Sequence, residues 1–131
     1  MERKKLSFFN VQVSAGFPSP AEDFKGQSLD LNTHLVKHPT SSFFVRVTGD
    51  SMIGAGIIEG DLLVVDRSLS VKNSDIVLAV LNGEFTVKRW IKKKERVFLV
   101  PENPSYNTIE IKQEVDFQVW GVVTSAVHFF R

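Results

Sequence analysis

The dipeptide Asn82-Gly83 constrains the fold of this chain more than any other short segment. It separates two β-prone runs, residues 76–81 and 84–91, and Asn-Gly is a preferred pair for the two-residue turn of a β-hairpin. Five further segments with strand-forming composition accompany this predicted hairpin: residues 43–48, 61–66, 96–100, 108–111 and 117–123. The sequence therefore predicts a mainly β, antiparallel domain with one or two short helices.

The first 28 residues show little periodicity. Pro18 and Pro20 favour an extended chain, and the polar residues that follow offer no core of their own. Asp30 can cap a short helix over residues 31–37, which Pro39 ends. A chain of 131 residues is long enough for one domain with a real core. We therefore expect an N-terminal arm, residues 1–28, followed by one β-rich domain, residues 29–131.

The charge balance argues against a DNA-binding protein, and the composition excludes sites that depend on cysteine. The 16 Lys and Arg residues nearly balance the 15 Asp and Glu residues, and the resulting net charge of +1 is a weak basis for gripping DNA. The basic run at residues 88–96 is therefore more simply a solvated turn than a nucleic-acid contact. The absence of cysteine excludes disulfides, thiolate catalysis and cysteine-ligated zinc, and it fits a cytosolic location.

The first fifteen residues permit a second interpretation, a secretory signal peptide. Residues 1–5 are largely basic, residues 6–13 are largely apolar, and Val13-Ser14-Ala15 has the small residues of a cleavage site. The apolar stretch is short and contains Asn10 and Gln12, so secretion is the weaker alternative. No apolar run approaches the roughly 20 residues of a membrane span.

Ser51 and Lys88 are the candidate catalytic residues. Ser51 follows a hydrophobic strand at a glycine-containing turn, and Lys88 lies on a strand of the predicted hairpin. A serine hydroxyl is a poor nucleophile until a base takes its proton, and a lysine held neutral can be that base. Near the start of the chain, Ala15-Gly16 is a small-residue junction that such a dyad could cut. Each residue also has a simpler interpretation, Ser51 as a turn former and Lys88 as a solvated edge residue.

Strand alternation favours the simpler interpretation of Lys88. Phe85, Val87 and Ile91 share one face of the strand, which leaves Lys88 on the other face with Glu84, Thr86 and Trp90. A lysine with a pKa of about 10.4 needs an ammonium destabilised by about 4 kcal/mol to be half neutral near pH 7. For Lys88 to act as a base, its face must therefore be covered, by Trp90 or by the arm.

A Ser-His-Asp arrangement is the competing scheme for nucleophilic catalysis. It would use His34 or His38 with Asp50 or Asp66. Surface positions explain these histidines, and His128 near the end of the chain, more simply. No spacing of histidines and carboxylates predicts a metal site, and we expect no cofactor.

Six stretches in register give the chain a resemblance to a known family. The chain is similar to the UmuD-type SOS mutagenesis proteins, which are relatives of the LexA repressor and of the phage repressors that cut themselves. The matching stretches cover residues 15 to 131 and are 15–20 (AGFPSP), 30–32 (DLN), 49–52 (GDSM), 60–66 (GDLLVVD), 83–88 (GEFTVK) and 121–123 (GVV).

This resemblance implies a Ser-Lys peptidase that acts on itself, with Ser51 as nucleophile and Lys88 as general base. The family's scissile bond maps onto Ala15–Gly16. The resemblance also implies a cytoplasmic homodimer, stimulation of cleavage by the RecA–single-stranded-DNA filament, and a cleaved product that joins a UmuC-type Y-family DNA polymerase. No direct sequence-specific DNA binding and no membrane partner are expected.

Two alternatives and one departure accompany the resemblance. A repressor would need a helix-turn-helix domain before the cut, and we expect none because fifteen residues cannot fold into one. A non-catalytic β-scaffold that binds a polymerase or filament, with structural Ser51 and Lys88, stays open. The segment before the cut is shorter than is typical of the family, which leaves cleavage within one chain or between partners undecided.

Overall fold

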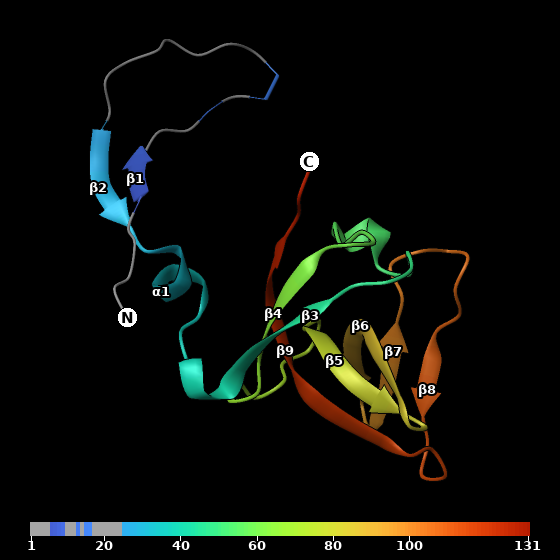
Figure 1. The fold of residues 1–131 in the computed structure, drawn as a ribbon. Helices are drawn as coiled ribbons and strands as arrows, with labels where there is room; N and C mark the ends of the chain where they lie inside the picture. The colour runs from blue at the N-terminus through green and yellow to red at the C-terminus, as the bar shows by residue number, and fades with distance from the viewer. Residues whose placement is uncertain (1–5, 10–12, 14, 17–24) are drawn as a thin grey trace. The chain divides into compact units, whose positions relative to one another are not determined.

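The computed structural model describes residues 6–9, 13, 15–16 and 25–131 (Figure 1). The chain divides into two compact units, Met1–Leu35 and Val36–Arg131. The first contains the predicted cleavage bond and the second contains Ser51 and Lys88. The units therefore divide after residue 35, within the range that the sequence assigns to the β-rich domain.

The N-terminal unit contains two paired strands and a short helix. Strands β1 (Leu6–Phe9) and β2 (Lys25–Leu29) are antiparallel, a pairing that the low periodicity of this segment did not predict. Helix α1 (Leu31–Leu35) follows directly. Asp30 caps it as predicted, because its Oδ1 accepts the backbone N–H of Thr33 over 3.5 Å. The helix ends two residues before the predicted end at residue 37.

The second unit is built on a seven-stranded antiparallel sheet in the order β3-β4-β9-β5-β6-β7-β8 (Figure 1). All the predicted strand segments form, with small differences at their ends. Two 3-10 helices, η1 (Pro39–Ser41) and η2 (Ile53–Ala55), precede β3 and β4. The strands are β3 (Ser42–Arg46), β4 (Leu62–Asp66), β5 (Ile76–Leu81), β6 (Glu84–Lys93), β7 (Arg96–Val100), β8 (Ile109–Ile111) and β9 (Phe117–Val127).

The predicted hairpin joins β5 to β6. Leu81 pairs with Glu84 across the turn, and Asn82 and Gly83 have φ values of 50° and 83°. Positive φ at both central residues is the requirement that makes Asn-Gly the favoured pair. The Asn82 amide N also donates to Asp116 O over 2.7 Å, which ties the hairpin to the chain entering β9.

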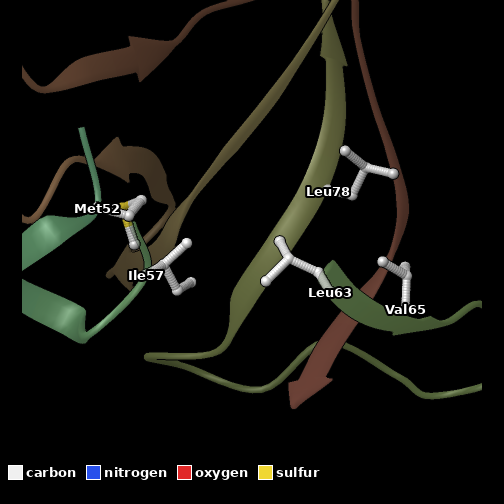
Figure 2. Packing of buried hydrophobic residues seen from close by; sticks show 5 residues of the cluster. All are labelled: Met52, Ile57, Leu63, Val65 and Leu78. Atoms are coloured by element: carbon white, nitrogen blue, oxygen red, sulfur yellow. The ribbon is translucent and has the colours of Figure 1, made fainter. Parts of the chain in front are cut away.

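Two apolar clusters form the core. The larger one contains Met52, Ile57, Leu63, Val65 and Leu78, contributed by the β3–β4 connection, β4 and β5 (Figure 2). The smaller one contains Val77, Ala79 and Leu99. Side chains from opposite faces of β5 belong to different clusters, because successive residues of a strand point to opposite sides of the sheet. The β3–β4 connection, which carries Ser51, is thereby packed into the core.

Candidate active site

Ser51 lies in the β3–β4 connection between a fixed strand end and a buried side chain. The Val47 amide N donates to Asp61 O over 2.9 Å, which holds the start of the connection. Gly49 has a φ of +82°, a left-handed conformation that favours glycine. Met52, the residue after the serine, is 3% exposed and packs in the larger core cluster (Figure 2). These constraints on both sides fix the backbone at Ser51.

The structure brings Lys88 of β6 to Ser51. Lys88 Nζ donates to Ser51 Oγ over 2.9 Å, to Thr86 Oγ1 over 2.8 Å and to the carbonyl oxygen of Val87 over 3.1 Å. Thr86 stands two residues before Lys88, so the two side chains share a face of the strand as the alternation predicts. All three acceptors are uncharged oxygens.

Burial lowers the pKa of Lys88 from its ordinary value of 10.5. The physical cause is desolvation, because the ammonium loses water while the neutral amine loses little. A carboxylate beside the ammonium would oppose this effect, but among the described residues none contacts Nζ. The site therefore favours the neutral amine, the form that can take a proton from a hydroxyl.

A cavity of about 360 Å³ adjoins the two residues. Its lining is mostly apolar, and the polar exceptions include the Ser51 and Lys88 side chains. The apolar lining residues are Phe43, Val45, Val47, Met52, Ile57, Leu78, Phe85, Val87 and Trp120. A second cavity, of about 490 Å³, shares Phe85, Thr86 and Lys88 with the first and extends to Tyr106 and Ile109. Lys88 thus lies where two hollows of the surface meet.

The tryptophan beside the site differs from the one considered from the sequence. Trp90 packs against the smaller core cluster and does not line the cavity. Trp120 of β9 lines the cavity instead, with its ring edge-on to Phe85 at 5.0 Å and to Phe43 at 6.5 Å between centroids. Strand alternation predicts which face of β6 Trp90 occupies. It cannot predict which neighbouring strand contributes a tryptophan to the lining of the cavity. No local signal marked Trp120.

The histidines of the competing scheme pair with other groups. His38 Nδ1 lies 2.6 Å from Asp66 Oδ2, and His128 Nδ1 lies 2.7 Å from Asp61 Oδ1. Neither imidazole contacts Ser51. Hydrogen bonds from Ser68, and a further one with His38, lower the pKa of the buried Asp66 to about 2. These are buried carboxylates satisfied by partners, as the cost of burying a charge requires.

The competing scheme also names His34 and Asp50. His34 is in helix α1, in the N-terminal unit. The Asp50 carboxylate accepts the Tyr106 hydroxyl over 2.6 Å. The described contacts therefore assemble a Ser-Lys pair and no Ser-His-Asp arrangement.

The predicted cleavage bond lies at an exposed bend. Ala15 and Gly16 are both solvent-exposed, and Val13 is 83% exposed. An exposed segment with small residues is the kind of chain that a peptidase site can accept, because it needs no unfolding of a packed element.

The described part of the chain contains neither a metal-binding cluster nor a membrane-spanning helix. It holds no group of three or more His, Asp or Glu side chains arranged to bind a metal ion. It also holds no helix long and apolar enough to span a bilayer.

Known proteins match this chain over most of its length. Protein SamA of Salmonella typhimurium is 45% identical over 123 residues, which cover 94% of this chain and 85% of SamA. Protein MucA of Escherichia coli is 41% identical over 123 residues, covering 93% and 84% of the two chains. Protein ImpA of Salmonella typhimurium is 41% identical over 124 residues, covering 94% and 83%.

A family model agrees with these relatives. The model described as Peptidase S24-like matches residues 7–124, which include the predicted cleavage bond, Ser51 and Lys88. The match spans both compact units of the structure. The chain belongs to the Peptidase S24-like family.

Proposed function

We propose that this protein is a self-cleaving serine peptidase of the SOS DNA-damage response, which cuts its own Ala15–Gly16 bond. Ser51 is the nucleophile and Lys88 the general base. The observation that carries the proposal is the 2.9 Å contact between Lys88 Nζ and Ser51 Oγ beside a largely apolar cavity. Membership of a peptidase family supports the same chemistry.

The reaction proceeds in two steps that share one base. Neutral Lys88 takes the Ser51 proton as Oγ attacks the carbonyl carbon of Ala15. The resulting ammonium gives that proton to the amide nitrogen of Gly16, the C–N bond breaks, and residues 1–15 remain attached to Ser51 as an ester. Lys88, neutral again, takes a proton from water, whose oxygen attacks the ester carbonyl and releases the new carboxyl group with Ser51 restored.

The neighbours of Lys88 orient its amine for these transfers. Thr86 Oγ1 and the Val87 carbonyl oxygen accept two of its N–H bonds, which leaves the remaining direction at Nζ for Ser51. The backbone N–H of Ser51 has no acceptor among the described residues. A free N–H at the nucleophile is suited to bind the oxygen that becomes negative when the carbonyl is attacked.

The cavity suits the sequence around the proposed cut. Ala15 and Gly16 have the smallest side chains, so a strand carrying them can lie close to Ser51. Val13 is exposed in the N-terminal unit and can bury its side chain against the apolar lining near Trp120 and Phe85. Burying a valine favours binding by about 1.5 kcal/mol or more.

The proposed biological role follows the family resemblance. The protein acts in the cytoplasm as a homodimer, the RecA–single-stranded-DNA filament stimulates its cleavage, and the shortened form supports translesion synthesis with a UmuC-type Y-family DNA polymerase. The arm-bearing and shortened forms differ by fifteen residues, so the cut can change which partners bind. Cleavage within a chain and cleavage between partners are both compatible with this role.

Intact-mass analysis after alkaline incubation of the purified protein tests the proposal. We expect the chain to lose residues 1–15, faster as the pH rises, because deprotonation of Lys88 supplies the base. Ser51→Ala and Lys88→Met are expected to stay intact, while Lys92→Met, at an exposed position of the same strand, is the matched control and is expected to cut normally. Wild-type protein that stays whole, or Ser51→Ala that is cut equally, would falsify the proposal and favour a non-catalytic scaffold.

A further inference from the structure

The turn that carries Ser51 is attached on two sides to a single residue, Glu102, in the β7–β8 connection (residues 101–108). The Glu102 amide N donates to Ser51 O over 2.8 Å, and the Gly54 amide N donates to Glu102 O over 2.7 Å. One peptide segment therefore holds the nucleophile's own carbonyl and the turn that follows it.

Two neighbours of Glu102 extend this attachment to Asp50. Asn103 Nδ2 donates to the Asp50 carbonyl oxygen over 3.0 Å, and the Tyr106 hydroxyl donates to Asp50 Oδ1 over 2.6 Å. Asn103 Oδ1 also accepts the Ser105 amide N over 2.9 Å, which folds the connection on itself. Residues 50, 51 and 54 are thus all hydrogen-bonded to residues 102–106, which we call the brace.

The carboxylate of Glu102 reaches the strand that carries the base. Arg89 follows Lys88 on β6, and its Nε donates to Glu102 Oε1 over 2.5 Å while its Nη1 donates to Ser74 O over 2.6 Å. Both partners of the ion pair are partly buried, with 27% and 34% of their side chains exposed. Such a pair is screened less by solvent than a surface pair and holds a defined geometry.

Glu102 therefore joins the two segments that carry the pair, because its backbone is bonded to Ser51 and its side chain to Arg89, the residue after Lys88. The serine and the lysine come from segments with separate connections to the rest of the sheet, so their separation depends on what joins these segments. Proton transfer and attack need near-contact geometry, and an error of about 1 Å costs about a hundredfold in rate.

We infer that Glu102 is a positioning residue for the proposed cleavage, which sets the Ser51–Lys88 separation by joining the Ser51 turn to Arg89 of β6. This inference rests on the proposed function. Glu102 is hydrogen-bonded to neither reacting atom, and burial, with no charge partner, is the cause that lowers the pKa of Lys88. Its removal should lower the rate of the correctly protonated enzyme without moving the pH at which Lys88 loses its proton.

The test measures self-cleavage of purified Glu102→Gln across the alkaline range and compares it with wild type. We expect the maximal rate at high pH to fall by about tenfold or more, with the midpoint of the pH–rate profile unchanged. Glu110→Gln is the matched control, because Glu110 accepts Arg96 Nε and Nη2 over 2.9 and 2.7 Å between β7 and β8. Removing that pair, which contacts no residue of the site, is expected to leave the rate unchanged.

A double-mutant cycle combines Glu102→Gln with Arg89→Gln. It distinguishes an effect on the cleavage rate that acts through the ion pair from two independent effects of the single variants. If the two side chains act through each other, the double variant should be about as slow as either single variant. Thermal unfolding of each variant, recorded in a Ser51→Ala background, checks that all are folded at the assay temperature.

Three results would overturn the inference while leaving the proposed function intact. They are a Glu102→Gln rate equal to wild type, a shifted midpoint with an unchanged maximum, and full additivity of the two single variants. Failure of the wild-type protein to cut itself would instead remove the proposed function, and the positioning role with it.

Discussion

At the scale of single residues, the ammonium of Lys88 has oxygen partners but no counter-charge among the described residues. Its pKa in the folded protein is lowered by burial from 10.5. Between the lowered value and 10.5, the unfolded chain binds more protons than the folded protein, so stability rises with pH across this window. At lower pH the protein carries the cost of a partly buried ammonium that has no counter-charge.

This linkage predicts a pH-dependent effect of Lys88→Met. We expect the variant to be at least as stable as a Lys88 protein at pH 7, and the difference in Tm to shrink as the pH approaches 10. Both proteins are compared by circular dichroism in a Ser51→Ala background, which prevents cleavage. Lys92→Met is the control at an exposed position of the same strand. A variant that melts well below the Lys88 protein at pH 7 would make the lysine a structural residue.

At the scale of elements, helix η2 packs closely against the brace at Gly54. A Cβ built on this residue would lie 2.6 Å from the carbonyl oxygen of Glu102. The atom that it meets belongs to the backbone and is itself hydrogen-bonded to the Gly54 amide. A side chain at position 54 must therefore push the Ser51 turn and the β7–β8 connection apart.

Gly54→Ala is accordingly expected to slow self-cleavage at least tenfold in protein that is still folded. Tyr106→Phe, which removes only the hydroxyl bound to Asp50, is the milder companion and should cause a smaller loss. Intact-mass kinetics give the rates, and melting curves show whether each variant is folded during the assay. Unaltered cleavage by folded Gly54→Ala would mean that the contact with Glu102 does not hold the site.

The strands were predictable because their signals are local. Alternating apolar residues and an Asn-Gly pair fix β5, the turn and β6 without reference to distant parts of the chain. The brace has no such signal, since Asn103 and Tyr106 stand more than 50 residues from Asp50 and resemble ordinary loop residues. The pairing of β1 with β2 escaped prediction for a related reason. Its strands are short, and neither alternates clearly.

The site itself was predictable in part. The residues made Ser51 and Lys88 candidates, the family resemblance implied their roles, and the structure places their side chains in contact. The number of residues between Ser51 and Lys88 does not give their distance in the fold. The residues alone therefore gave no reason to prefer a Lys88 in contact with Ser51 over a solvated Lys88. The contact with Thr86 is local, because residues 86 and 88 share a face of one strand. The place of Trp120 in the cavity lining depends instead on the strand order of the sheet, which no single segment encodes.

At the scale of the whole molecule, the proposed cut would change the binding surface without changing the β-rich unit. Residues 1–15 lie outside the unit Val36–Arg131, which contains the seven-stranded sheet and both core clusters. Loss of these fifteen residues therefore leaves that unit's packing in place. A switch of partners would then come from exposure of new surface.

A chain starting at Gly16 is expected to form the same homodimer as the uncleavable Ser51→Ala protein and to bind the error-prone polymerase with a different affinity. Light scattering measures the mass of each form, and titration against the polymerase compares the two affinities. Circular dichroism of both forms is the necessary control, because a difference in polymerase affinity would have a trivial cause if one form had lost the common fold. A monomer at micromolar concentration, or equal affinities, would leave the arm without a switching role.

The strands β1 and β2 stand on opposite sides of the Ala15–Gly16 bond. While the chain is continuous, the linking segment keeps β1 at a high effective concentration near β2. A cut would turn one molecule into two, and a strand of four residues is too short to remain paired by its own affinity. The freed peptide would then be lost to dilution, leaving an open edge on β2. Hydrolysis of a peptide bond is favourable in water, and dilution of the freed peptide would make the cut still harder to reverse, with no nucleotide or other energy source required.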